Sequence, residues 1–171
     1  MRQGRRDGFR EFAAGRSGHL YRSACLLASG DTHLAEDLVQ ETLGRMYLLW
    51  GRISRIDNPA AYAQTVLVRA FLTHQRRRSS KERPVGEFPE SGASVAGGTD
   101  PVLRLTLLEA LGRLAPKDRA VLVLRYWEDR SVEETADAMN VSSAAVRTRT
   151  SRALARLRDQ LGGSLAEFAD H

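Results

Sequence analysis

The sequence predicts an all-α protein: two small helical bundles joined by a flexible linker. Apolar residues recur at helical spacing over most of the chain, and strand signals are nearly absent. Capping residues stand directly before prolines at the starts of two predicted helices, at Asn58-Pro59 and Asp100-Pro101. The segment Ser79–Thr99 is rich in Pro, Gly and Ser and has no periodicity. A chain of 171 residues has room for one domain or two small ones.

The first bundle is expected over residues 1–80, with three or four helices. Apolar residues at a spacing close to 3.6 predict a helix over Arg5–Ser29, which Gly15 and Gly18 are able to bend or break. A glycine stop and the Asp31 cap then lead into a second helix, Thr32–Trp50. After an expected loop at 51–57, Asn58 caps a third helix that runs to about Arg78.

A linker is expected over residues 81–99, and a second bundle over residues 100–161. Asp100 and Pro101 open its first helix, and Pro116 opens the next. Ser131 is the expected cap of a third helix, with Glu134 at the capping-box position. After a tight turn at Asn140, the last helix is expected from Ser143 to about residue 161, followed by a frayed tail at 162–171.

The most specific local pattern is a helix-turn-helix over Val132–Ser151. Ala136 is small where the two helices approach, and Asn140 tolerates the left-handed backbone that the turn requires. Short residues and arginines on the outer face of the second helix suit the DNA major groove. The alternative is a solvated basic face of an ordinary amphipathic helix. This outer face carries Ala144, Thr148, Ser151 and Arg152, flanked by Arg147 and Arg149.

The first bundle carries a basic cluster and an acidic face. Arginines gather near the end of its third helix, where one or two would be explained by the helix dipole alone. Tyr62 on that helix is either a core residue or a platform for an unpaired base. The acidic face of the second helix is either solvated or binds a partner with basic residues. Its members are Glu36, Asp37, Gln40 and Glu41, and the basic cluster comprises Arg69, Arg76, Arg77, Arg78, Lys81 and Arg83.

Composition and motifs argue against other classes of function. The four histidines are scattered, and the chain has no phosphate-binding glycine loop, nucleophile elbow or zinc-protease motif. We therefore expect no enzyme, no cofactor and no metal site. The single cysteine, Cys25, excludes an internal disulfide and fits a cytoplasmic protein, as a small core residue or else a redox sensor. No apolar stretch is long enough for membrane insertion.

These segments together resemble an extracytoplasmic-function (ECF) sigma factor of bacterial RNA polymerase, from the sigma-70 family. The resemblance rests on Asp37–Glu41, on the helix that starts at Asn58-Pro59, and on the block from Ala120 to Arg158. They occur in the family's order, over about residues 9–161. The stretches His33–Val39 and Leu48–Ser54 and the linker start at 83–85 resemble the actinobacterial SigE-type group.

The resemblance implies a role for each part. The first bundle would be domain 2, whose positions Asp37, Gln40 and Glu41 belong to the surface that binds the polymerase β′ clamp helices. Domain 2 would also recognise and melt the −10 element, and the second bundle would be domain 4, recognising the −35 element. The implied −35 residues are Ser143, Ala144, Arg147, Thr148, Arg149 and Arg152. The linker would pass through polymerase near the RNA exit path. The implied −10 residues are Asp57, Asn58, Tyr62, Arg69, Arg76 and Arg77.

Two positions depart from the family's pattern. Arg69 replaces the usual Asn, and Tyr62 replaces a common Trp, so a different −10 preference is expected. The implied partners are the β and β′ subunits of core polymerase and promoter DNA, with an anti-sigma protein as a further candidate. The alternatives are a conventional dimeric helix-turn-helix regulator and a helical protein that sequesters a partner. Without polymerase, the two bundles are expected to dock on each other or on an anti-sigma protein through apolar surfaces.

Overall fold

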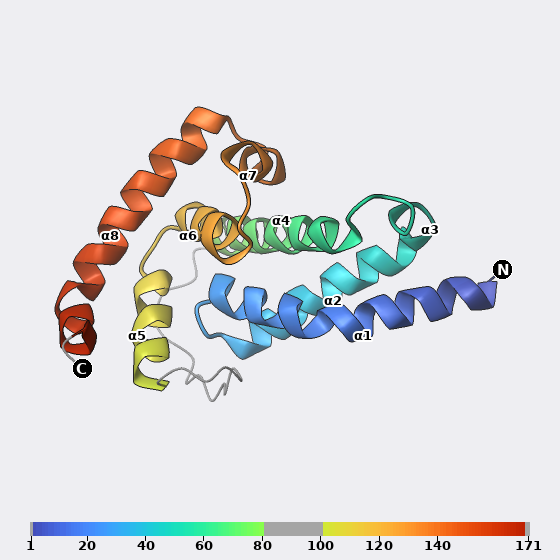
Figure 1. The fold of residues 1–171 in the computed structure, drawn as a ribbon, viewed down its shortest axis with the longest axis horizontal. Coiled ribbons are helices and arrows are strands. Elements are labelled where there is room, and N and C mark those ends of the chain that lie inside the picture. Colours follow the sequence, from blue (N-terminus) through green and yellow to red (C-terminus); the bar gives the residue numbers. More distant parts are fainter. Residues whose placement is uncertain (1, 81–100, 170–171) are drawn as a thin grey trace.

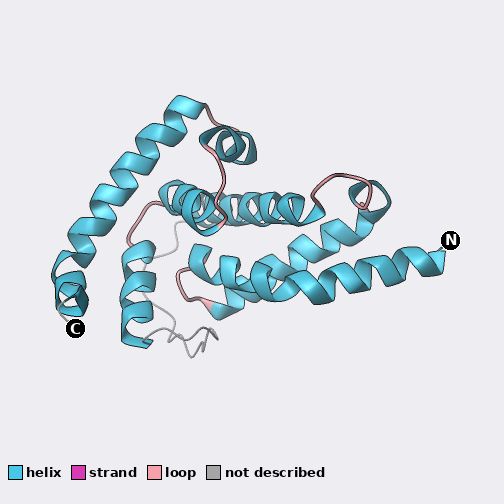
Figure 2. Ribbon diagram, in the orientation of Figure 1, coloured by secondary structure: helices cyan, strands magenta, loops and turns pink. Residues whose placement is uncertain are grey.

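The computed structural model describes residues 2–80 and 101–169, so the expected linker at 81–99 lies outside the described residues. The N-terminal bundle (residues 2–80) contains α1 (Arg2–Leu27), α2 (Thr32–Leu48), α3 (Trp50–Ile53) and α4 (Pro59–Ser80). The C-terminal bundle (residues 101–169) contains α5 (Pro101–Gly112), α6 (Pro116–Leu122), the π-helical segment η1 (Val123–Trp127), α7 (Val132–Met139) and α8 (Ser143–Ala169). All elements of the described residues are helical, which confirms the predicted fold class (Figure 2).

The predicted helix ends are confirmed by their hydrogen bonds. The Asp31 carboxylate accepts from the Leu34 amide at 3.1 Å at the start of α2. Ser131 and Glu134 form the reciprocal capping box of α7. Asn140 ends α7 in the left-handed conformation, with φ 55° and ψ 47°, which turns the chain into α8.

Three elements differ from the sequence predictions. The expected loop at 51–57 begins inside the helical turn α3, because Trp50 and Ile53 are both buried and draw this segment onto the core. Helix α1 is continuous through Gly15 and Gly18. Helix α8 continues to Ala169, where a frayed tail was expected from Gly162. Propagating a helix that has already formed adds one hydrogen bond per residue, which offsets the cost of a glycine.

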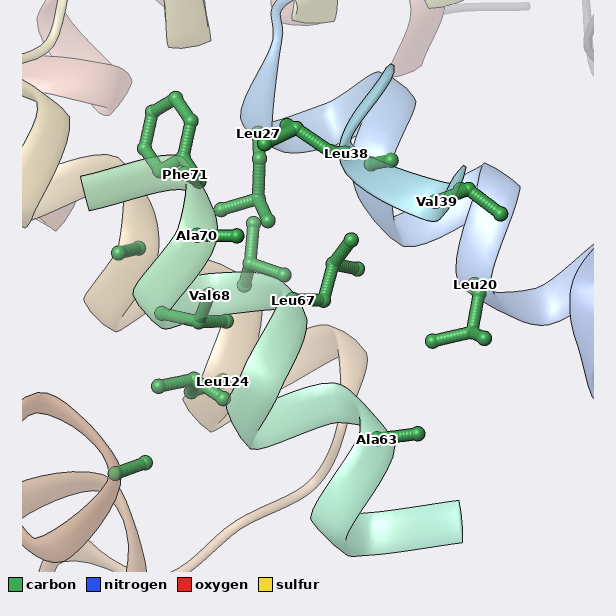
Figure 3. Packing of buried hydrophobic residues seen from close by; sticks show 14 of the residues in the cluster. Leu20, Leu27, Leu38, Val39, Ala63, Leu67, Val68, Ala70, Phe71 and Leu124 are labelled. Carbon is green, nitrogen blue, oxygen red and sulfur yellow. The ribbon is translucent and has the colours of Figure 1, made fainter. Parts of the chain in front are cut away.

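The two bundles share one hydrophobic core. Helix α4 lies in the middle of the molecule, with α1 and α2 on one side and α6 and α7 on the other (Figure 1). Residues of both bundles belong to the same buried cluster, among them Leu20, Leu27, Leu67, Val68 and Phe71 from the N-terminal bundle and Leu124 from η1 (Figure 3). Each of these six side chains is at most 1% exposed. The expected docking of the bundles on each other is therefore present in the structure.

None of the described helices is long and apolar enough to cross a membrane. A smaller second cluster lies between α5, α6 and α8, around Leu111, Leu122 and Ala153. It holds the long helix α8 along the edge of the C-terminal bundle (Figure 1).

Candidate nucleic-acid interface

The N-terminal half of α8 has one buried face and one exposed face. Val146 and Ala153 are fully buried against the other helices of the C-terminal bundle. The structure exposes four of the six residues expected to contact DNA on α8, and leaves Ser143 and Arg149 half-buried. The exposed four are Ala144, Arg147, Thr148 and Arg152. This face has the short residues and the arginines that a major-groove helix needs.

The Arg149 side chain binds a residue of α6 and does not extend from the exposed face of α8. Its Nη1 donates to the carboxylate of Asp118 on α6 at 3.2 Å, and Arg156 approaches the same carboxylate at 3.7 Å. Asp118 is buried, so its charge needs a cationic partner. Arg149 therefore fastens α8 to α6 in this arrangement and lies at the edge of the exposed face.

The predicted −10 residues follow α4 and the loop before it. Asp57, Asn58, Arg76 and Arg77 are exposed. The Asn58 side chain caps α4 by accepting from the Ala61 amide at 3.0 Å. Tyr62 is 37% exposed, so it is not the core tyrosine of the alternative interpretation and is accessible to a base.

Arg69 has a different set of contacts from its neighbours on α4. Its Nε donates to the Ala138 carbonyl at 2.9 Å, and its Nη2 to the Asp137 carbonyl at 3.1 Å. Both carbonyls belong to the last turn of α7, where a cation also complements the helix dipole. Arg69 thus binds the helix-turn-helix of the other bundle.

The acidic face of α2 is open to solvent. Asp37, Gln40 and Glu41 are exposed, while Leu38 and Thr42 face the core. Glu41 forms an exposed ion pair with Arg45 one turn later, at 3.2 Å. Such a pair contributes little to stability, so the carboxylates remain available to a basic partner.

Two further arginines cross between the bundles. Arg119 of α6 is 7% exposed and donates to the carbonyl of Leu27, the last residue of α1, at 2.6 Å. It also lies 5.6 Å from the ring centroid of Phe71 on α4. Burial lowers the pKa of Arg119 to about 10. The guanidinium is held by carbonyl dipoles and an aromatic face, and no ion pair with a described residue compensates it.

Arg130, in the turn before α7, makes the second crossing. Its guanidinium donates to the Ala61 carbonyl and, at 2.8 Å, to the Thr65 hydroxyl, both on α4. Burial lowers the pKa of Arg130, and the nearby Glu128 and Glu134 carboxylates oppose that shift. The Arg130 side chain therefore joins the turn at 128–130 to the first half of α4, the part of the helix that contains Tyr62.

A polar cluster at the end of η1 also joins the C-terminal bundle to the N-terminal bundle. The Glu128 carboxylate accepts from the Ser23 hydroxyl at 2.7 Å and pairs with His19 Nε2 at 2.8 Å. The Trp127 indole donates to the Ser23 oxygen at 2.9 Å and stacks on the His19 ring at 5.8 Å between centroids. Every hydrogen bond in this cluster joins α1 to the C-terminal bundle.

Comparison with known proteins assigns both bundles. Residues 16–81 match the family model for Sigma-70 region 2, and residues 104–157 match that for Sigma-70, region 4. The RNA polymerase sigma-E factor of Streptomyces coelicolor is 39% identical over 153 residues, which cover 90% of this chain and 85% of the relative. The chain belongs to the sigma-70 family of RNA polymerase sigma factors.

Other relatives place this sigma factor in the ECF group. The ECF sigma factor SigL of Mycobacterium tuberculosis is 30% identical over 143 residues, covering 81% of this chain and 80% of the relative. The solved structure of the sigma factor RpoE with the anti-sigma factor NepR, from Bartonella quintana, aligns with a TM-score of 0.74 and 26% identity. That alignment covers 91% of this chain and 97% of the other. The function is therefore promoter-specific initiation of transcription with RNA polymerase.

The sequence did not reveal the residues that join the bundles. Arg119, Arg130 and Glu128 have no motif of their own, because their partners lie about a hundred residues or dozens of residues away. The sequence showed only a polar residue, Arg119, within the apolar run of α6 and a polar turn at 128–130, which was insufficient to name their partners.

Proposed function

We propose that this sigma factor binds core polymerase through the acidic face of α2 and recognises promoters through two further surfaces. Asp37, Gln40 and Glu41 would contact the β′ clamp helices. The exposed loop and helix around Asn58 and Tyr62 would recognise and melt the −10 element, by stacking and phosphate attraction. The exposed face of α8 would recognise the −35 element in the major groove.

The domain limits follow from this assignment. Residues 1–80 would form domain 2, residues 81–99 the linker and residues 100–161 domain 4. The chain would act without catalysing a reaction, because polymerase supplies the chemistry. It would work in the cytoplasm, together with polymerase and, as a further candidate partner, an anti-sigma protein.

The docked bundles would be the form that the sigma factor adopts without polymerase. Arg69 is bound by the end of α7, and the Arg130 side chain binds the first half of α4. Both parts of α4 belong to the surface assigned to the −10 element. The bundles would therefore separate before promoter recognition, and polymerase would hold them apart at the spacing of the two elements.

The exposure of the carboxylates on α2 is the main support for this proposal, and an assay of core polymerase binding tests it. The double variant Asp37→Lys with Glu41→Lys is expected to weaken core polymerase binding at least roughly tenfold, because rim charges reversed against a basic partner repel it. Asp7→Lys with Glu11→Lys is the matched control, since both residues are exposed at the same spacing on α1. Equal core affinity of the two variants would refute the assignment of this face.

The DNA side is tested separately by promoter-dependent transcription with core polymerase. Arg147→Ala with Arg152→Ala is expected to abolish most promoter activity while core binding is retained. Arg113→Ala, an exposed arginine of the same bundle outside α8, is the control. Unchanged transcription by the double variant would exclude α8 as the −35 reader.

A further inference from the structure

A cleft of about 850 Å³ opens where the two bundles meet, between α4 on one side and α6, α7 and the start of α8 on the other. The described residues that line it include five cations and no carboxylate. The cations are Arg45, Arg69, Arg76, Lys117 and Arg149. Because the walls come from both bundles, the cleft exists only while the bundles are docked.

The cations of the cleft are unequally compensated. Arg45 and Arg149 have ion pairs with carboxylates, and Arg69 is bound to carbonyls of α7. Among the residues that the structure describes, the Arg76 guanidinium has one hydrogen-bond partner, the hydroxyl of Thr73 on its own helix, at 3.3 Å. Lys117 forms no ion pair within the described part of the chain. Each bundle therefore contributes to the cleft one cation that has no ion pair with a described residue.

This arrangement favours a ligand with several negative charges close together. Arginine forks and lysine ammonium groups both bind phosphate oxygens strongly, and several such groups around one cleft match a chain of linked phosphates. A volume of about 850 Å³ is within the range of small-molecule sites. Leu72, Met139 and Val141 add an apolar part to the lining, against which a ring system is able to pack.

We propose that this cleft binds a short chain of linked phosphates, either inorganic or carried by a nucleoside, and that the ligand holds the two bundles together. The phosphates bridge Arg76 of the N-terminal bundle and Lys117 of the C-terminal bundle. Bridging removes the repulsion between these two cations and adds bonds that are lost on opening. The ligand therefore opposes separation of the bundles.

Calorimetric titration of the full chain tests the site, with sodium tripolyphosphate as one probe and GTP as the other, at about 0.15 M salt. One saturable site per chain is expected. Arg76→Ala and Lys117→Ala should each weaken binding roughly tenfold or more, the effect of removing one charge-assisted hydrogen bond. Arg78→Ala and Arg113→Ala, exposed arginines outside the cleft, should change the affinity little.

The two probes distinguish the sources of the phosphates. If GTP binds more tightly than tripolyphosphate, the ligand of the cleft is a nucleoside polyphosphate whose base packs on the apolar part of the lining. Equal binding assigns an inorganic phosphate chain. Three outcomes would overturn the proposal. The control variants weaken tripolyphosphate binding as much as Arg76→Ala and Lys117→Ala do, sulfate binds as tightly as tripolyphosphate, or only a short oligonucleotide binds.

A second measurement reports whether the ligand holds the bundles together. Val68 of α4 is 1% exposed within the shared core, so Val68→Cys in a Cys25→Ala background places a single thiol that opening uncovers. Tripolyphosphate at about ten times its dissociation constant should slow labelling of this thiol roughly tenfold. An unchanged labelling rate at saturation would show that the ligand does not favour the docked form. Neither experiment contains polymerase or promoter, so their failure leaves the proposed function untouched.

Discussion

Removing the Glu128 carboxylate should open the docked bundles. Glu128→Ala breaks two contacts to α1: the hydrogen bond from Ser23 at 2.7 Å and the pairing with His19 at 2.8 Å. Ser23 is fully buried, whereas the His19 side chain is 28% exposed and its contact is partly screened. A hydrogen bond to a charged group contributes roughly 1.5–3 kcal/mol, so the pair contributes about 3 kcal/mol once the screening is counted.

The loss of about 3 kcal/mol makes the equilibrium constant for separation of the bundles, the opening constant, about a hundredfold larger, because each 1.4 kcal/mol is a factor of ten. The Val68→Cys reporter described above measures it directly, since labelling through rare opening is proportional to the opening constant. Labelling should be about a hundredfold faster with Glu128→Ala. Glu133→Ala is the control, because Glu133 is exposed on α7 and its one ion pair among the described residues is with Arg147 of the same bundle, at 3.6 Å. Equal labelling rates in the two variants would refute the role of the Glu128 cluster.

Three other predictions concern the helix-turn-helix and the core. Asn140→Val should lower the free energy of unfolding by roughly 1–2 kcal/mol, because a β-branched residue is strained at φ 55°, whereas Asn140→Gly should be nearly neutral in the same urea titration. Glu134 accepts the Ser131 amide, which lowers its pKa below the ordinary 4.5. The contribution of the Glu134 carboxylate to the free energy of unfolding is therefore complete above pH 4.5 and is lost as the pH falls through the lower pKa of the folded state. The free energies of unfolding of the wild type and Glu134→Gln should therefore converge in acid. Cys25 is 1% exposed, and burial raises the pKa of its thiol, so iodoacetamide should modify it at least a hundredfold more slowly in the native chain than in urea. Rapid native alkylation would instead favour a redox role.

The sequence predicted the local features of the fold well. Caps such as Asp31 and Ser131, the left-handed turn at Asn140 and the helix start at Pro59 depend on residues within four positions of one another. Short-range hydrogen bonds of this kind leave a direct signature in the sequence. The α3 turn was missed because it depends on the burial of Trp50 and Ile53 against distant helices.

The candidate surfaces were predicted by residue type but not by environment. Exposure of the acidic residues on α2 and of the outer face of α8 agrees with the helical spacing. Arg69 and Arg149 have the residue type of a DNA contact, yet one binds the end of α7 and the other binds Asp118. Those partners depend on how the helices pack across the two bundles, which periodicity within a single helix does not contain.

Transcription with purified bacterial core polymerase and a pool of genomic promoter fragments measures directly whether this chain initiates transcription at specific promoters. With the wild-type chain, initiation at discrete sites should depend on the chain, and the mapped starts should share two upstream elements. The chain alone should bind the same fragments weakly, because its bundles are docked and Arg69 is occupied. Absence of initiation, together with tight binding of duplex DNA by the chain alone, would contradict the account and favour a conventional helix-turn-helix regulator.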